Sequence, residues 1–225
     1  MAGTKRPRVT LTYAQSLDGS IAARSGEPLS LSGPEAARYT HQLRAAHDAI
    51  LVGIGTVLSD NPRLNVRLAS GASPRPIVLD SELRCPLNAR CLEAARRPII
   101  VASQRASASN RAALEAQGVT VLSLASRVDD QAQLDLAKML SELLVLDVRS
   151  VMVEGGAHVI TSFLRSRLVD RLIITIVPIL VGGLHGVVEL LSDEAPEFPR
   201  LRQPTWLKLG DDWVVAGTPA WSSQV

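Results

Sequence analysis

The sequence predicts an α/β fold of three layers, α/β/α, with a mostly parallel central sheet and an antiparallel hairpin at its C-terminal edge. Two observations lead to this prediction. Through most of the 225 residues, short runs of β-branched and aliphatic residues alternate with segments that repeat apolar residues at helical spacing. Near the C-terminus this alternation stops, and Gly210-Asp211-Asp212 separates two apolar runs in the manner of a hairpin turn.

Each expected strand is a short apolar run of the length typical of a buried strand. The first, at 9–13, follows a short polar N-terminal segment, and a later one at 172–177 is rich in isoleucine. The other expected strands lie at 49–52, 77–79, 99–101, 119–122 and 150–153, and the C-terminal hairpin covers 206–215.

The expected helices lie between these strands. Gly33-Pro34-Glu35 begins the first helix, because proline favours the first helical position, and apolar residues then keep one helical face down to about His47. Gly118 ends a helix at 110–117. Further helices are expected as one or two turns at 53–58, at 131–144 with Leu134, Leu140 and Leu144 at helical spacing, and from about Ala157.

Composition and charge exclude several classes of function. Hydrophobic residues make up 46% of the chain, and its net charge is +2 with acidic and basic residues interspersed. Such a chain can bury a core, and it lacks the basic stripe of a nucleic-acid-binding surface. The longest apolar run, 172–181, is about half the length of a membrane span, and no N-terminal segment resembles a signal peptide. We therefore expect one cytoplasmic domain over 1–225 that binds neither nucleic acid nor a membrane.

Cysteine and histidine form no pattern typical of a metal site. Cys85 and Cys91 have no cluster of Cys or His beside them, so free thiols are expected and a metal is not. The sequence also lacks the motifs of zinc proteases and of serine hydrolases. Acid–base chemistry is then left to carboxylates, of which Asp60 and Glu154 are the leading candidates.

Four short clusters follow expected strands, at the edge where parallel sheets bind ligands. They lie at 14–19, 53–62, 80–81 and 154–156. The last, Glu154-Gly155-Gly156, has the pattern of a phosphate site, because glycines allow close approach and the following helix offers unpaired N–H groups. The cluster at 53–62 lacks the third glycine of a GxGxxG dinucleotide fingerprint, since Leu58 occupies that position.

Several of these residues also have an explanation that needs no ligand. The cluster at 14–19 could be an Asp-Gly turn, and Ser81 with Arg84 could either hold a 2′-phosphate or form a solvated turn. Arg44 and Arg67 could bind a substrate phosphate through bidentate hydrogen bonds, although each alone is more typical of a surface charge.

Four motifs, in this order, resemble those of the pyrimidine reductases of riboflavin biosynthesis, a family with a dihydrofolate-reductase-like fold. The resemblance runs from about Arg8 to Val215. It rests on Thr12-Tyr13-Ala14-Gln15-Ser16-Leu17-Asp18-Gly19, the segment 53–62, Ile77-Val78-Leu79-Asp80-Ser81 and Val153-Glu154-Gly155-Gly156. The family uses NADPH to reduce a ribosylamino-pyrimidine 5′-phosphate to its ribitylamino form, so the resemblance implies this activity and this cofactor.

The resemblance also implies which residues form the site. Glu154 and Asp60 would be catalytic. The substrate contacts would be Arg44, Leu64, Arg67 and Glu154. The NADPH contacts would be Ala14, Ser30, Thr56, Asp60 and Ser81, together with Gly155, Gly156, Ala157, His158, Val159, Ile160, Thr161 and Ser162 around the start of the pyrophosphate-binding helix.

Two departures from the family pattern bear on the substrate. Thr12 stands where many bifunctional bacterial members have lysine, and the chain lacks the His-x-Glu and Pro-Cys-x-x-Cys signatures of their fused deaminase. It is therefore more similar to the stand-alone type, a single reductase domain without a deaminase, which reduces the diamino compound. Pro28 falls where some members have a polar substrate contact.

Three alternatives remain open from the sequence. The substrate could be the deaminated pyrimidine, or the same fold could reduce another compound such as dihydrofolate. A non-catalytic nucleotide-binding module is an alternative of a different class. The C-terminal hairpin, with Trp206 and Trp213, could simply complete the sheet edge, whereas the resemblance implies that it helps to form a homodimer.

Overall fold

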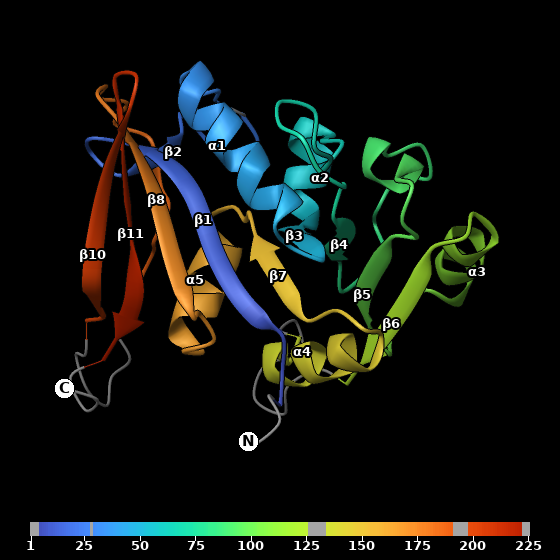
Figure 1. The fold of residues 1–225 in the computed structure, drawn as a ribbon. Coiled ribbons are helices and arrows are strands. Elements are labelled where there is room, and N and C mark those ends of the chain that lie inside the picture. The colour runs from blue at the N-terminus through green and yellow to red at the C-terminus, as the bar shows by residue number, and fades with distance from the viewer. Residues whose placement is uncertain (1–4, 28, 126–133, 191–197, 222–225) are drawn as a thin grey trace.

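The computed structural model describes residues 5–27, 29–125, 134–190 and 198–221. Within them one sheet has nine strands (Figure 1), and neighbours from β8 to β6 are parallel. The hairpin at the other edge is antiparallel, so the predicted sheet is confirmed. The strand order is β10 (Arg200–Leu209), β11 (Asp212–Ala220), β8 (Arg171–Val177), β1 (Arg8–Ser16), β7 (Ser150–Val153), β3 (Ala49–Gly53), β4 (Arg75–Leu79), β5 (Ile99–Ser103) and β6 (Thr120–Leu124).

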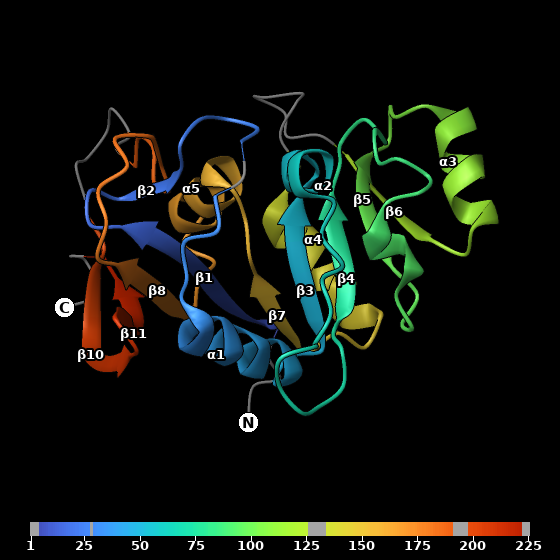
Figure 2. The same cartoon turned by 90° about the horizontal axis from the view of Figure 1, so that it is seen from above.

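Helices cover both faces of this sheet because alternate residues of each buried strand point to opposite sides. In β3, Ala49 and Leu51 belong to one apolar cluster, and Ile50 and Val52 belong to a second. Figure 2 shows α1 and α5 on opposite sides of β1. The face of Leu51 packs against α4 (Leu136–Val145) and α5 (Ala157–Arg165), and the other face against α1 (Pro34–Ala45), α2 (Ile54–Asp60) and α3 (Ala108–Ala116).

The predicted helix at 131–144 was wrong at its start. The helix α4 begins at Leu136, and Leu134 forms a β-bridge instead; residues 131–133 lie outside the described part of the chain. The cause is local, because the Asp135 side chain accepts a hydrogen bond from the Lys138 N–H (3.0 Å) and so caps the helix at this point.

Three short elements have no counterpart among the predictions. The strands β2 (Ser20–Ala22) and β9 (Leu184–His185) pair in a small second sheet, and η1 (Arg90–Glu93) is a 3-10 turn. The predicted C-terminal hairpin is confirmed: Leu209 pairs with Asp212 across a two-residue turn, in which Gly210 has a φ of 62°.

The described residues include both cysteines and were also searched for a membrane-spanning helix and for a metal site. Cys85 and Cys91 are both buried and free, as predicted. In the described ranges, we find no helix that is both long enough and apolar enough to cross a membrane, and no group of three His, Cys, Asp or Glu side chains that could hold a metal ion.

Candidate active site

The four clusters singled out from the sequence follow four strands that are adjacent in the sheet, β1, β7, β3 and β4. Because these strands are parallel, their carboxyl ends lie together at the upper edge of the sheet in Figure 1. Segments that are far apart in sequence therefore meet at one edge, as the fold class predicts.

The main polar contact at this edge joins Arg44 of α1 to Glu154, which directly follows β7. Arg44 donates from Nε to Oε1 of Glu154 (2.7 Å) and from Nη2 to Oε2 (2.6 Å), a bidentate pair with side-chain exposures of 12% and 18%. Burial acts to lower the pKa of Arg44, but the hydrogen bonds and the charge of Glu154 outweigh it and raise that pKa. Arg44 is therefore held in its charged form.

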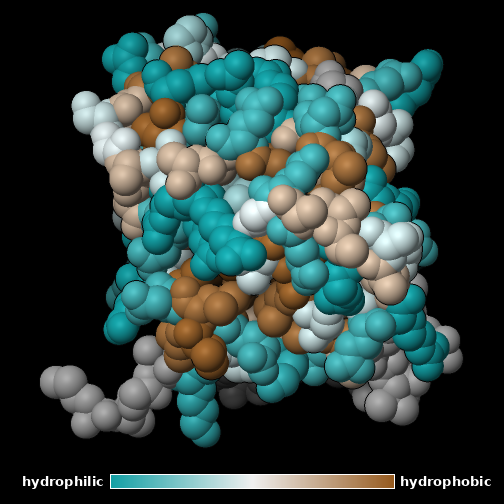
Figure 3. All heavy atoms as spheres, turned by 90° about the vertical axis from the view of Figure 1, so that its right-hand side faces the viewer, coloured by the Kyte–Doolittle hydropathy of each residue, from teal (hydrophilic) through white to brown (hydrophobic). Residues whose placement is uncertain are grey.

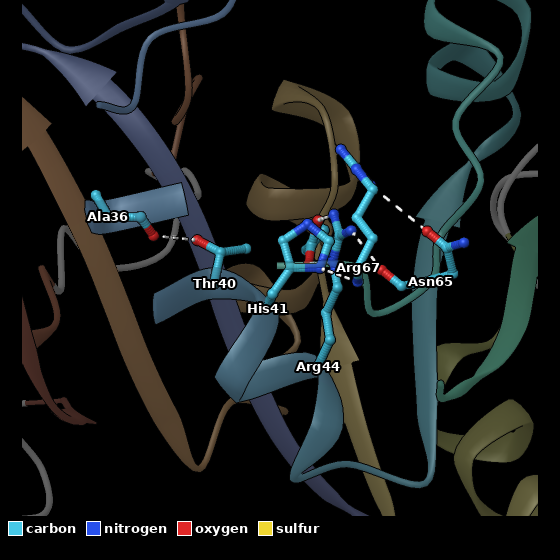
Figure 4. Close-up of polar contacts among 7 residues, drawn as sticks. Ala36, Thr40, His41, Arg44, Asn65 and Arg67 are labelled. Carbon is cyan, nitrogen blue, oxygen red and sulfur yellow. Dashed lines mark hydrogen bonds and ion pairs between the residues drawn. The ribbon is translucent and has the colours of Figure 1, made fainter. Parts of the chain in front are cut away.

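The loop between α2 and β4 is fixed to α1 at several points (Figure 4). The Asn65 carbonyl accepts from Arg44 Nη1 (3.1 Å), and the Arg67 N–H donates to Nδ1 of His41 (3.0 Å). Further along, a Cβ atom on Gly71 would lie 2.7 Å from Cβ of Ala45, so the loop packs closely on the last turn of α1. The structure thus brings two of the predicted substrate contacts, Arg44 and Arg67, to one place.

Leu64, another predicted substrate contact, lies in the same loop, but its side chain is buried. It is 2% exposed, packs in the apolar cluster beneath α2, and has a φ of 51°. The whole residue is therefore withdrawn from the surface of this loop.

Two glycines at this edge are required because α5 packs closely against the carboxyl ends of β3 and β7. A Cβ atom on Gly155 would lie 2.5 Å from Cβ of Val159, and one on Gly53 would lie 2.9 Å from its Cγ2. Gly156 caps α5 without a side chain, and a Cβ atom there would lie 3.9 Å from Oγ1 of Thr56. The first turn of α5 therefore faces α2 across a strip of bare backbone, which suits a pyrophosphate group.

The remaining residues of the predicted pyrophosphate segment differ in exposure. Ala157, Ile160 and Thr161 are buried, and Oγ1 of Thr161 accepts from the Val188 N–H (3.0 Å). His158 is exposed. An anion at this position would meet mainly the backbone of the first turn.

The first cluster adopts the Asp-Gly turn considered from the sequence. Gly19 has a φ of 83° and its N–H donates to the Ser16 carbonyl (3.0 Å). The Asp18 carboxylate accepts from the hydroxyls of Ser16 and Ser20 and from the N–H groups of Val181 (2.9 Å) and Gly182 (2.8 Å). Asp18 therefore fastens a distant loop to the end of β1, which the sequence did not reveal.

The third cluster contains a buried carboxylate. Asp80 is fully buried and its Oδ2 accepts from the Cys85 N–H (2.8 Å), while Arg84 lies 4.0 Å from Oδ1 and pairs with Glu82 at 3.4 Å. Ser81 is partly exposed at the turn that follows β4. Arg84 therefore faces the carboxylates of its own turn.

The other predicted residues lie on the surrounding surface. Asp60 is the exposed last residue of α2 and accepts a hydrogen bond from the Ser59 hydroxyl. Ala14 is half-buried near the end of β1, where it pairs with Thr175, and Ser30 is exposed. Pro28 lies outside the described residues.

Two residues of this site were missed in the sequence analysis, His41 and Asn65. His41 lies within the first expected helix, and Asn65 contributes its backbone carbonyl. No motif marks either of them, because both act through hydrogen bonds to residues more than 20 positions away.

Comparison with known proteins bears on the family and the fold. The model of the family described as "RibD C-terminal domain" matches residues 7–215. A 2,5-diamino-6-ribosylamino-4(3H)-pyrimidinone 5′-phosphate reductase of Debaryomyces hansenii is 40% identical over 80% of this chain and 78% of its own length. The riboflavin biosynthesis protein RibD of Aquifex aeolicus is 33% identical over 94% of this chain, which spans 57% of that protein. The solved structure of the Saccharomyces cerevisiae riboflavin biosynthesis reductase Rib7 has a TM-score of 0.79 and 34% identity, covering 98% of this chain and 93% of that one.

The close contact between Gly155 and Val159 predicts that alanine destabilises the protein at position 155 but not at position 55. Gly155→Ala should lower the free energy of unfolding by about 1–3 kcal/mol, because the new methyl group would force α5 away from the end of β7. Gly55→Ala is the matched control: a Cβ there meets nothing within 4 Å, and alanine in α2 should be neutral or stabilising by up to about 1 kcal/mol. Urea unfolding of both variants checks this, and equal effects would contradict the packing role of Gly155.

Proposed function

The chain belongs to the RibD C-terminal domain family, and from this membership we propose that it is an NADPH-dependent reductase of riboflavin biosynthesis. Its substrate would be 2,5-diamino-6-ribosylamino-4(3H)-pyrimidinone 5′-phosphate, as named for the Debaryomyces relative, and its product the ribitylamino compound. The observation that carries this proposal is the Arg44–Glu154 pair. It lies next to Gly155 and Gly156 and next to the loop between α2 and β4, which contains Arg67. The two free thiols are consistent with a cytoplasmic enzyme.

The residues at the start of α5 fit a dinucleotide. The side-chain-free cap at Gly156, with Thr56 facing it, leaves room for a pyrophosphate at the positive end of the helix. Ser81, at the end of β4, would contact the 2′-phosphate that distinguishes NADPH. The bound cofactor would supply a hydride, which is the chemistry that no side chain can provide.

The substrate would bind between Glu154 and Arg67. Glu154 is hydrogen-bonded to Arg44 through both carboxylate oxygens, and its remaining lone pairs can accept from the N–H groups of a pyrimidine edge. The Arg67 side chain, which is exposed and lies beside Asn65 in Figure 4, would bind the 5′-phosphate or the ribose hydroxyls.

The reaction would begin with ring opening of the ribose, which yields an imine at C1′. Hydride adds to C1′, and the imine nitrogen takes up one proton, so that the product carries an open ribityl chain. Asp60, exposed at the end of α2, would relay this proton from solvent. The protein contributes mainly orientation and charge complementarity.

Thr12 supports the diamino substrate. It lies on β1 opposite Ile173 and is 5% exposed, on the sheet face that α1 covers. A lysine here, as in many bifunctional members, would place a cation beneath α1. The neutral threonine would therefore mark the stand-alone type, which reduces the diamino compound.

We further propose that the enzyme is a homodimer formed through its C-terminal hairpin. The strand β10 is an edge of the sheet, and its Trp206 (59% exposed) lies on the same side as Trp213 of β11 (45% exposed). That side is opposite the face on which α1 covers Val214. At the other end of the molecule, near α3, hydrophilic and hydrophobic side chains are interspersed (Figure 3). An exposed apolar edge favours pairing with a second copy.

The substrate assignment predicts NADPH oxidation by the purified protein with the diamino compound. We expect its kcat/KM to exceed that of the deaminated compound, and dihydrofolate to be inert. Faster turnover of the deaminated compound would keep the pathway but refute the role of Thr12. Turnover of dihydrofolate alone would identify another reductase, and tight NADPH binding without turnover of any of the three would identify a non-catalytic binding module.

Replacement of Glu154 tests the site itself. Glu154→Gln keeps the shape and one acceptor oxygen but removes the charge, so kcat/KM should fall by roughly a hundredfold while the protein stays folded. Glu189→Gln is the matched control, since Glu189 is an exposed carboxylate paired with Arg165 and should leave kcat/KM unchanged. Steady-state kinetics measures kcat/KM, and circular dichroism checks that each variant is folded. A near-normal kcat/KM for Glu154→Gln would reject the proposed role of Glu154.

The dimer predicts a mass of twice 24.1 kDa in solution. Trp206→Glu places a charge on the exposed edge and should shift the protein to the monomer, whereas Val145→Glu, at an 80% exposed position at the end of α4, should not. Light scattering coupled to gel filtration measures the mass. A monomeric wild-type protein, or the same mass for all three proteins, would contradict the proposed interface.

A further inference from the structure

The helix α1 buries two residues, Ala36 and His41, and His41 is the polar one. It is 3% exposed, and its Nδ1 accepts a hydrogen bond from the N–H of Arg67. The reaction proposed above makes no use of an imidazole. Because a buried polar side chain is normally hydrogen-bonded, the role of His41 is sought in the group to which it bonds.

His41 and Arg44 lie one helical turn apart on the same face of α1 and hold the same loop. Arg44 binds the Asn65 carbonyl, and His41 binds the N–H two residues later. A third hydrogen bond, from the Val66 N–H to Oγ of Ser73 (3.1 Å), closes the loop on itself. Of these three contacts, the one to His41 is made by the backbone of Arg67, so it fixes the point from which the Arg67 side chain reaches the ligand.

This hydrogen bond requires a neutral imidazole, because a protonated Nδ1 cannot accept. The ring proton must then be on Nε2. The charged groups that face His41 are Arg44 on α1, Arg67 in the loop and Glu154 after β7. Burial, then Arg44 and then Arg67 lower the pKa of His41 to about 4, against the opposing effect of Glu154. The arginines of the site thus keep His41 in the form that accepts.

We propose that His41 is a positioning residue for substrate binding: it holds the Arg67 backbone so that the guanidinium meets the substrate phosphate. This inference rests on the proposed function, since it takes Arg67 to be a substrate contact. His41 touches neither reacting partner in this scheme. Its loss should therefore weaken substrate binding equally in the ground state and the transition state, which raises KM and leaves kcat unchanged.

The sign of the pH effect follows from the lowered pKa. In the unfolded chain a histidine takes up a proton near pH 6.5, whereas folded His41 does so near pH 4. The native state is therefore fully stable with respect to this group above about pH 6.5 and loses stability as the pH falls from there toward 4.

Three variants separate positioning from general structure. In His41→Ala the Arg67 N–H loses its acceptor, and KM for the pyrimidine substrate should rise about tenfold with kcat within about twofold. In His41→Asn the amide oxygen can take the place of Nδ1, so KM should return to within about threefold of wild type. His47→Ala is the matched control, because His47 is a partly buried histidine just beyond α1 whose ring hydrogen-bonds with the Leu43 carbonyl and the Thr10 hydroxyl, and its KM should not change.

A second measurement needs no turnover. The ring nitrogens of His41, observed by NMR, should show the neutral form with the proton on Nε2 at pH 5.5, where an ordinary histidine is about 90% protonated. The Arg67 amide resonance should shift in His41→Ala and stay close to wild type in His41→Asn. A protonated His41 at pH 5.5, or an equal KM for His41→Asn and His41→Ala, would overturn the proposal. If the wild-type protein does not reduce the pyrimidine at all, the proposed function fails, whereas the NMR result still decides whether His41 holds Arg67.

Discussion

The site depends on one interaction, the bidentate ion pair between Arg44 and Glu154. It joins the middle layer of the fold to a helix that packs on it, because Glu154 directly follows β7 and Arg44 is in the last turn of α1. Burying two charges is favourable only when both are fully hydrogen-bonded, and removal of one partner typically costs about 3–5 kcal/mol. Arg44 meets this condition with a third bond to the Asn65 carbonyl, so the same guanidinium also sets the path of the loop.

A second constraint acts on the opposite side of β7. Val159, in the first turn of α5, packs against the backbone at both Gly53 and Gly155 and so fixes the distance between the carboxyl ends of β3 and β7. This contact explains why glycines stand at both positions independently of any ligand, and it also leaves the start of α5 free of side chains. Close packing and the proposed anion binding therefore both require residues without side chains at the start of α5. This is why the Glu154-Gly155-Gly156 motif was so informative.

The sequence predicted the features that depend on local patterns. Alternation of strands and helices gave the parallel sheet, and its carboxyl edge is where the four clusters meet. It missed β2 and β9, because these short strands depend on distant contacts such as that of Asp18 with the N–H groups at 181 and 182. His41 was missed for the same reason: its partner is a backbone N–H 26 residues later, and no pattern of residue types records such a bond. The proposed roles of Asp60 and Ser81 remain predictions, since in the structure both lie on the surface around the site.

The neutral and the positively charged groups of the site lie at different places. Arg44 and Glu154 together are neutral, so the carboxylate can accept hydrogen bonds from a neutral pyrimidine without adding net charge. The net positive charge is placed elsewhere: Arg67, whose pKa is lowered first by burial and then by Arg44, Arg90 and Arg63, belongs to a cluster of cations at the loop. The start of α5 supplies a further positive end without any ionised side chain. In the proposed function, an anionic substrate and an anionic cofactor would each bind opposite its own positive group, with the neutral pair between them.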